Sequence, residues 1–204
     1  ELWLNGNQLT GSIPPEIGNL TNLGYLNLSN NQITGSIPPE IGNCPLSILS
    51  LQNNQLTGSI PPEIFNYPFL SIINLSNNQL TGSIPPEIGD LSLFNLYLND
   101  NQLSGLIPDE ICNNDDYFWP SNINFNNNQL CTPYPSCIED YVGEQDTSNC
   151  ENVSVSDDLI PYTYKLYSAY PNPFNPFTTL RYDLSEGGLV NITIYDMLGN
   201  AINQ

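Results

Sequence analysis

The sequence predicts an α/β-type repeat solenoid, mostly β, that ends in a disulfide-rich cap and is followed by a partial β-sandwich. Three observations support this prediction. An Asn recurs at steps of 24, 23, 24, 23 and 27 residues, apolar residues alternate around it, and four of the five cysteines cluster where the repeat ends. Such internal periodicity is typical of solenoids. The recurring residues are Asn7, Asn31, Asn54, Asn78, Asn101 and Asn128.

Each repeat contains a short apolar alternation just before its Asn. In the second repeat, Leu26 and Leu28 flank Asn27, and this period of two predicts a strand with one buried face. One coil cannot bury its apolar residues alone, so neighbouring coils are expected to stack. The equivalent apolar pairs are Leu2 and Leu4, Leu49 and Leu51, Ile73 and Leu75, Leu96 and Leu98, and Ile123 and Phe125.

Polar and special residues complete each coil. We expect the recurrent Asn to turn the chain after the strand, because its amide satisfies backbone groups that the bend leaves unpaired. A glycine in each repeat is expected to supply a backbone angle or a close approach that a Cβ would obstruct. The proline pairs are expected to stop helix propagation and hold that side extended. The glycines are Gly11, Gly35, Gly58, Gly82 and Gly105.

The second half of each repeat carries a specific motif. Residues 9–14, 33–38, 56–61 and 80–85 read Leu or Ile followed by Thr-Gly-Ser-Ile-Pro, and residues 103–108 are a looser copy. This pattern resembles the leucine-rich repeat proteins, in the subclass first described in plant extracellular receptors and inhibitors, over roughly residues 1–150. The resemblance implies a right-handed solenoid whose strands line a concave side.

Residues that alternate with the buried leucines would then face outward on this concave side. They are neutral, rich in amides and interspersed with aromatic rings, which suits a glycan. Trp and Tyr also suit a protein partner equally well, and the monotony of the repeats is compatible with a generic adhesive surface. The predicted binding residues are Trp3, Tyr25, Asn27, Ile48, Ser50, Gln52, Ile72, Asn74, Asn95, Tyr97, Asn99 and Asn124.

The charge of the chain excludes several functions. It has 2 Lys+Arg, 21 Asp+Glu and no His, for a formal charge of −19. Nucleic acids and anionic membranes are bound mainly through Lys and Arg, so neither partner is expected. Without His the chain lacks the commonest general base and the imidazole ligands of zinc. With no run of 18 apolar residues, no membrane insertion is expected either. We therefore predict no enzyme activity, no cofactor and no metal.

One glutamate recurs at the same place in five repeats. Stacking would set these carboxylates roughly 5 Å apart, where each neighbouring pair repels by about 0.8 kcal/mol in water before salt screening. A solvated stripe that aids solubility explains them. A site for a divalent cation or a basic partner is the alternative. The residues are Glu16, Glu40, Glu63, Glu87 and Glu110.

The cysteines predict a cap and an oxidising compartment. Cys44 aligns with Leu20 of the first repeat and is expected to pack as a small buried hydrophobe. The cluster of Cys112, Cys131, Cys137 and Cys150 predicts two disulfides that close the last coil. Three pairings are possible, and we favour Cys112–Cys131 with Cys137–Cys150. A zinc site is the alternative.

The composition changes after residue 150. Residues 151–161 are acidic and Ser-rich, as in a linker. The runs 178–184 and 190–196 alternate as strands joined by a turn at 185–188. The motif Tyr-Pro-Asn-Pro-Phe-Asn-Pro at 170–176 resembles the immunoglobulin-like C-terminal sorting domain of bacterial type IX secretion substrates. This resemblance implies export across an outer membrane.

Four segments follow: a six-repeat solenoid at 1–130, a Cys-rich cap at 131–150, a linker at 151–161 and an incomplete immunoglobulin-like domain at 162–204. Together they predict a secreted or cell-surface bacterial protein that acts by non-catalytic binding or adhesion to a protein or glycan. The alternative is a subunit of an extracellular filament. Copies would assemble by head-to-tail stacking of coils and by strand complementation at an open sheet edge.

Overall fold

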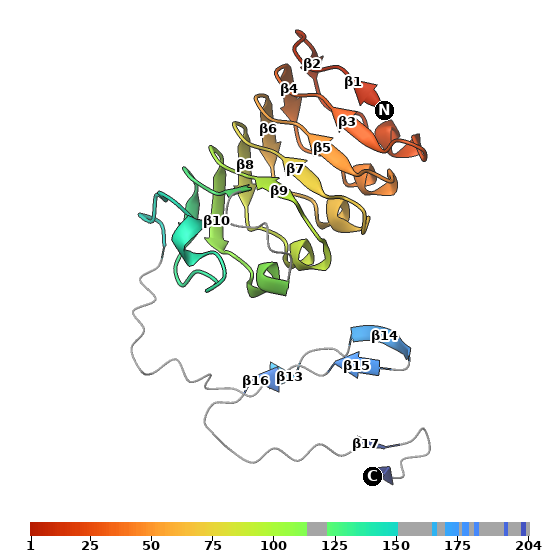
Figure 1. Cartoon of the computed structure of the whole chain (residues 1–204), viewed down its shortest axis with the longest axis vertical. Coiled ribbons are helices and arrows are strands. Elements are labelled where there is room, and N and C mark those ends of the chain that lie inside the picture. Colours follow the sequence, from red (N-terminus) through yellow and green to blue (C-terminus); the bar gives the residue numbers. More distant parts are fainter. Residues whose placement is uncertain are drawn as a thin grey trace. The chain divides into compact units, whose positions relative to one another are not determined.

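The computed structural model describes residues 1–113 and 122–150 in full, and the backbone of six short strands between residues 165 and 202. The chain divides into two compact units, Glu1–Glu151 and Asn152–Gln204. The first unit is the predicted solenoid, in which each coil passes through two strands and a short helix (Figure 1).

One strand from each coil forms the first sheet, which is parallel and six-stranded in the order β1-β3-β5-β7-β9-β11. Equivalent residues of successive coils lie opposite one another, so Leu26 pairs with Leu49 and Leu49 with Ile73. All three are fully buried. The strands are β1 Leu2–Trp3, β3 Tyr25–Asn27, β5 Ile48–Ser50, β7 Ile72–Asn74, β9 Asn95–Tyr97 and β11 Ile123–Asn124.

The motif that follows each Asn forms a second parallel sheet, in the order β12-β10-β8-β6-β4-β2, which the sequence analysis missed. Its register differs from that of the first sheet. Thr34 lies opposite Gln55, so each coil is offset by two residues from its neighbour. The strands are β2 Thr10–Gly11, β4 Gln32–Gly35, β6 Gln55–Gly58, β8 Gln79–Gly82, β10 Gln102–Leu106 and β12 Gln129–Cys131.

Short 3-10 helices close the coils, and here the expectation for the proline pairs was half wrong. Pro38 is extended, with φ −71° and ψ 134°, but Pro39 begins a helix. A proline suits the first helical position because its φ is already helical and no N–H is needed there. The helices are η1 Pro15–Asn19, η2 Pro39–Asn43, η3 Pro62–Phe65, η4 Pro86–Asp90, η5 Asp109–Asn113 and, in the cap, η7 Glu139–Tyr141.

Glycines have two different roles in the coil. Gly58 has φ +76°, so the predicted need for a special backbone angle is confirmed there. Gly42, in η2, has a second role that the sequence analysis did not find. A Cβ at Gly42 would lie 2.1 Å from the backbone oxygen of Glu63, so successive helices approach more closely than any other residue allows.

The recurrent Asn side chains tie neighbouring coils together. The amide nitrogen of Asn78 donates to the carbonyls of Leu75 in its own coil and Leu51 in the preceding one, both at 3.1 Å, and also to Ser76. Its Oδ1 accepts a hydrogen bond from the N–H of Leu56 at 3.0 Å. The predicted turn role is confirmed, and the same amide also connects adjacent coils. We call this set of side chains the asparagine ladder.

The cap contains the two predicted disulfides, but the favoured pairing was wrong. The bonds join Cys112 to Cys137 and Cys131 to Cys150. Cys112 belongs to η5 and Cys131 ends β12, so the two occupy different elements of the coil. Each is instead reached by a cysteine of the segment that follows β12.

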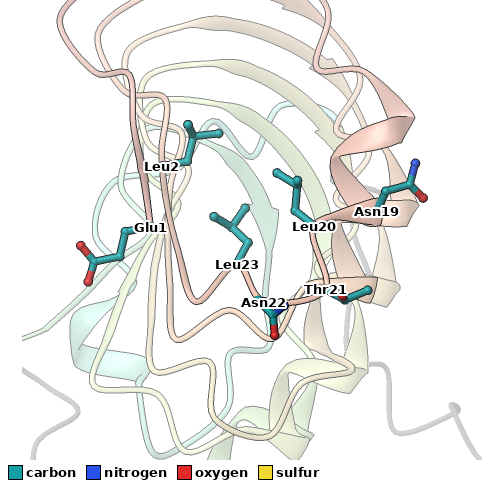
Figure 2. A pocket seen from close by; sticks show the side chains of 7 residues that line it. All are labelled: Glu1, Leu2, Asn19, Leu20, Thr21, Asn22 and Leu23. Carbon is teal, nitrogen blue, oxygen red and sulfur yellow. The ribbon is translucent and has the colours of Figure 1, made fainter.

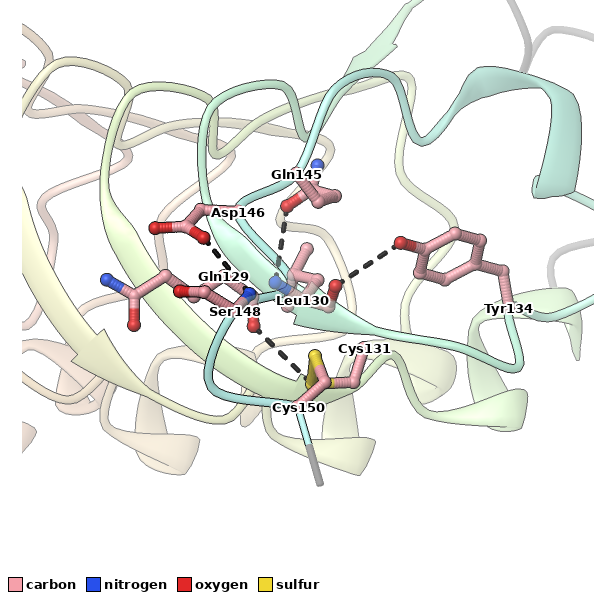
Figure 3. The surroundings of a disulfide bond; sticks show 8 residues. All are labelled: Gln129, Leu130, Cys131, Tyr134, Gln145, Asp146, Ser148 and Cys150. Atoms are coloured by element: carbon pink, nitrogen blue, oxygen red, sulfur yellow. Dashed lines mark hydrogen bonds between the residues drawn. A yellow bond between two sulfur atoms is a disulfide. The ribbon is translucent and has the colours of Figure 1, made fainter. Parts of the chain in front are cut away.

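A glutamine in the cap continues the asparagine ladder beyond the repeats (Figure 3). Gln145 Oε1 accepts a hydrogen bond from the N–H of Leu130 at 3.3 Å. Its Nε2 donates to the carbonyls of Phe125 at 2.9 Å and Val142 at 3.0 Å. The last coil therefore receives the same set of bonds that an Asn supplies to every earlier coil.

The described residues of the second unit form three two-stranded antiparallel sheets: β13 with β16, β14 with β15, and β17 with β18. The runs 178–184 and 190–196 contain the described strands β16 and β17, which pair with β13 and β18. The predicted linker at 151–161 lies outside the described residues. The strands are β13 Lys165–Leu166, β14 Tyr170–Asn175, β15 Phe177–Thr179, β16 Tyr182–Asp183, β17 Ile194–Tyr195 and β18 Ala201–Ile202.

Candidate functional site

The predicted binding residues all lie on or just after the strands of the first sheet, on the side away from the leucines. The register of the strands arranges them in three columns that run across the sheet, and we call this surface the first-sheet face. The first column contains Tyr25, Ile48, Ile72 and Asn95. The central column contains Trp3, Asn27, Ser50, Asn74, Tyr97 and Asn124. Gln52 and Asn99 belong to the third column, together with Ser29, Ser76 and Asn126.

None of the residues named in these columns is charged, and the one carboxylate beside them is Glu1, which precedes Leu2 in the register and so lies next to Tyr25. Most are half-buried beside the leucine core, and Ser29 and Ser76 are buried. The side-chain oxygen of Gln52 is also buried, and within the described part of the chain it has no hydrogen-bond partner. Trp3 is the most open of the predicted binding residues, with 53% of its surface exposed. The face is therefore a continuous neutral surface with many hydrogen-bonding groups.

Internal hydrogen bonds fix how the amides of the central column are oriented. Asn27 Oδ1 accepts from the N–H of Ser29 at 3.1 Å and from its hydroxyl at 2.7 Å. Asn74 makes the same two bonds with Ser76, and Asn124 Oδ1 accepts from the N–H of Asn126 at 3.0 Å. The acceptor end of each amide is thus occupied, and within the described part of the chain no hydrogen bond engages the three Nδ2 groups. The alternation with the leucines predicts the positions of these residues, whereas the orientation of their amides depends on hydrogen bonds that form only in the folded chain.

Aromatic rings stand at two places in the central column. Trp3 stacks on Tyr25, with ring centroids 4.4 Å apart and an interplanar angle of 25°. The indole nitrogen of Trp3 donates to Glu1 at 3.2 Å. Tyr97 lies between Asn74 and Asn124 in the register of the sheet. In the central column, aromatic rings therefore precede Asn27 and separate Asn74 from Asn124, whereas Ser50 separates Asn27 from Asn74.

An apolar pocket lies at the first coil (Figure 2). It has a volume of about 380 Å³. Leu20 is 44% exposed there, whereas Leu91, in the equivalent place of a later coil, is 3% exposed. Glu1 is the only carboxylate of the lining, so no pair of titratable groups is available for acid–base catalysis. The lining residues are Glu1, Leu2, Asn19, Leu20, Thr21, Asn22 and Leu23.

A second, polar pocket of about 440 Å³ lies where the last coil meets the cap. Its amides Asn128 and Gln145 are already used in backbone hydrogen bonds. Hydrogen bonds from the hydroxyl and the N–H of Ser148 lower the pKa of the Asp146 carboxyl. The residues around this pocket therefore hold the cap in place. They are Asn101, Asn127, Asn128, Gln129, Glu144, Gln145 and Asp146.

Cys44 is the one free cysteine, and its predicted burial is confirmed, with 1% of its surface exposed. Its sulfur donates to the carbonyl of Ile17 at 3.2 Å. Burial raises the pKa of this thiol. Because only the thiolate is a good nucleophile, Cys44 fills space in the core and has no reactive role.

Among the described residues, neither the recurrent glutamates nor any other Asp, Glu or Cys side chains form a group of three or more that could hold a metal ion. Among the described helices, none is long and apolar enough to cross a bilayer.

Comparison with known proteins agrees with this architecture. A family model described as "Leucine Rich repeats (2 copies)" matches residues 1–45, and one described as "Leucine rich repeat" matches residues 44–103. No curated protein matches the chain significantly.

Several solved structures resemble the chain. In the BIR3–SERK2 complex from Arabidopsis thaliana, the matching chain is 39% identical, with 67% of this chain and 72% of that chain covered and a TM-score of 0.57. The BIR2 ectodomain from the same plant is 35% identical, with 66% and 71% covered and a TM-score of 0.58. A plant ice-binding protein is 35% identical, with 63% and 41% covered and a TM-score of 0.55.

Proposed function

Because the chain belongs to the leucine-rich repeat family, we propose that it is a non-catalytic binding module, and that the first-sheet face recognises a protein or peptide outside the cell. The observation that carries the proposal is the face itself, a continuous uncharged surface of amides and aromatic rings across six strands. Aromatic residues are common anchors in protein interfaces, and charged groups are depleted at their centres.

The comparisons support this proposal in two ways. One of the similar structures, that of BIR2, is named an ectodomain, and the first is a complex of two proteins. The two disulfides of the cap favour an oxidising compartment, as expected for an extracellular protein. A glycan ligand uses the same amides and rings and is the alternative within the same proposal.

A selection experiment tests the proposal. A phage-displayed library of random peptides is selected on the immobilised protein, and the enriched clones are then offered to two variants. Ser50→Arg places a bulky charge at the centre of the first-sheet face, whereas Thr57→Arg places the same charge on the exposed side of β6. We expect Ser50→Arg to abolish binding and Thr57→Arg to preserve it. Clones that bind both variants equally well would overturn the proposal.

The finer proposal of bacterial type IX secretion rests on the motif at 170–176, most of which forms β14. The similar structures, by contrast, come from Arabidopsis thaliana, and the matches cover 67% and 66% of this chain. Fusing residues 162–204 to a reporter in a bacterium with this secretion system tests the proposal. Export of the reporter would support it, and retention of the fusion in the periplasm would contradict it.

Filament formation is the second candidate, and one observation favours it. Leu4, Leu9 and Leu20 are 36%, 38% and 44% exposed, and exposed apolar side chains of this kind are what a stacked coil covers. The cap covers the opposite end, however, and removes the matching surface for head-to-tail stacking. Sedimentation of the purified chain tests the alternative, since ordered polymers at modest concentration would favour it and monomers would exclude it.

A further inference from the structure

The central column of the first-sheet face has a spacing of its own. Asn27, Asn74 and Asn124 occupy β3, β7 and β11, which are alternate strands of the sheet. Neighbouring strands lie about 4.8 Å apart, so the free amide donors recur about every 9.6 Å. A ligand that uses all three donors must present an acceptor with nearly the same repeat.

The polyproline II helix has this repeat. It rises about 3.1 Å per residue with three residues per turn, so equivalent carbonyls recur about every 9.3 Å along one side. A β-extended peptide does not fit as well, because its equivalent carbonyls recur every two residues, or about 6.7 Å. The spacing therefore selects one peptide conformation over the other.

The hydrogen-bonding character of the face points to the same ligand. Hydrogen bonds to Ser29, Ser76 and Asn126 occupy the acceptor oxygens of the three amides, so the central column offers N–H donors. A proline residue has a carbonyl acceptor but no N–H donor. The backbone carbonyls of a polyproline II helix are also free of internal hydrogen bonds. The donor-rich face and the acceptor-only ligand are therefore complementary.

Ring contacts and charge add to this match. Trp3 and Tyr97 stand in the same column as the amides, and aromatic rings are the usual contact surface for proline-rich segments. The columns are uncharged, but the whole chain carries a formal charge of −19. A neutral or basic peptide avoids the repulsion that an anionic ligand would meet.

We propose that the first-sheet face binds a proline-rich peptide in the polyproline II conformation, with Asn27, Asn74 and Asn124 each donating to a carbonyl of a successive turn. This inference rests on the proposed function and names the ligand class of the same site. The column from Trp3 to Asn124 spans five strand intervals, or about 24 Å, which matches about eight residues of such a peptide.

A fluorescein-labelled peptide of nine prolines is the probe, and a labelled Gly-Ser peptide of equal length is the control ligand. Binding is followed by fluorescence anisotropy. We expect the oligoproline to bind at least tenfold more tightly than the Gly-Ser peptide, because it is already in the bound conformation and matches the donors.

Matched variants of the protein then test two of the three donors, Asn74 and Asn124. Asn74→Asp keeps the oxygen that accepts from Ser76 and replaces the free Nδ2 with a second oxygen. We expect it to weaken oligoproline binding by three- to tenfold or more, the loss expected for one hydrogen bond. Asn124→Asp should do the same at another strand. Asn19→Asp adds the same charge at an exposed residue of η1 and should leave the affinity unchanged.

The outcomes separate this inference from the proposed function. The polyproline II inference is overturned if the two peptides bind with equal affinity, or if Asn74→Asp and Asn124→Asp have no effect. The proposed function survives that result if Ser50→Arg still abolishes binding of the library-selected clones. If a chitin oligosaccharide binds and oligoproline does not, and if the same variants lose that binding, the face is assigned to glycans. Selected clones that tolerate Ser50→Arg would overturn both proposals.

Discussion

At the scale of single residues, the asparagine ladder shows how a short side chain connects two coils. Each interior ladder residue accepts from a backbone N–H of the preceding coil and donates to carbonyls of both coils, as Asn54 does with Leu28 and Leu51 at 3.0 Å. Only an amide supplies an acceptor and two donors in so small a volume. This requirement explains why Asn recurs without exception.

Removing one ladder amide should therefore be costly in the interior and harmless at the first coil. Asn78→Ala leaves the N–H of Leu56 and the carbonyls of Leu51 and Leu75 without this partner, and we expect a loss of about 2–4 kcal/mol in the free energy of unfolding. Asn7 is exposed and bonds only within its own coil, so Asn7→Ala should cost under about 0.5 kcal/mol. Urea denaturation measures both variants, and equal losses would contradict the interpretation.

The buried thiol of Cys44 gives a second prediction at this scale. Because burial raises its pKa, the folded protein should resist a disulfide reagent such as Ellman's reagent at pH 8, and one thiol should react once the chain unfolds in urea. The raised pKa also sets the sign of the pH effect. The stability that the neutral thiol contributes is complete below its unfolded pKa and is lost as the pH rises through the folded value. Rapid labelling of the native protein would disprove this assignment.

At the scale of elements, the packing of the 3-10 helices depends on an absent side chain. A Cβ at Gly18, Gly42 or Gly89 would lie 2.1–2.5 Å from a backbone oxygen of the next helix. In the third coil Phe65 occupies this position and is buried, so the contact between η3 and η4 is built differently. The close approach is thus a property of particular helix pairs.

Two glycine substitutions separate this effect from a general effect of glycine. Gly42→Ala should destabilise the protein by about 1–3 kcal/mol, because the methyl group meets rigid backbone. Gly24→Ala has its nearest neighbour at 3.7 Å, an ordinary contact, and should stabilise by up to about 1 kcal/mol through the unfolded state. Thermal unfolding followed by circular dichroism compares them. A neutral Gly42→Ala would show that the helices can move apart without cost.

The cap is the element most dependent on covalent bonds. The two disulfides close segments with sequence separations of 25 and 19 residues, and loops of this length predict about 3 kcal/mol of stabilisation from each. The double variant Cys131→Ser with Cys150→Ser should therefore lose about 3 kcal/mol in urea denaturation. Reducing agent breaks both disulfides, so the native protein in reducing agent should be less stable than this variant without reducing agent. An unchanged midpoint in the variant would exclude a stabilising role for the bond.

At the scale of the whole molecule, charge opposes the compact state. The formal charge of −19 produces self-repulsion, and raising the salt from about 10 mM to about 150 mM shortens the screening length from about 30 to about 8 Å. We therefore expect the melting temperature to rise with added NaCl. Glu63→Gln should reduce this salt dependence and Thr57→Ser, which changes no charge, should not. A melting temperature that is flat or falls with salt would contradict the expectation.

The repeat period was sufficient to predict the stacked coils, the buried places of Leu28, Leu51 and Leu75, and the ladder. These features recur within one coil and are visible in one-dimensional spacing. The second sheet was missed because β4 contains one buried residue, Ile33, and ends at a glycine with positive φ, so it shows no alternation. The disulfide pairing was wrong because it depends on how the cap folds back.

The candidate site was predictable in position but not in chemistry. Alternation with the buried leucines placed Asn27 and Asn74 on the first-sheet face. Which end of each amide is free depends on Ser29 and Ser76, whose role emerges only when the strand ends are folded. Gln145 lies outside the repeat period of the asparagines, so it could not be recognised as part of the ladder. Only the tertiary structure brings it to the last coil.

The place of Gln145 has a consequence for how this protein could change length. The hydrogen bonds that Gln145 makes to the last coil come from a segment outside the repeating unit. They therefore do not depend on how many repeats precede the cap. Duplicating or deleting one whole unit, such as residues 55–78, would leave both extremities unaltered. The number of repeats could then change by duplication or deletion, and a longer or shorter ligand could be bound with the same cap.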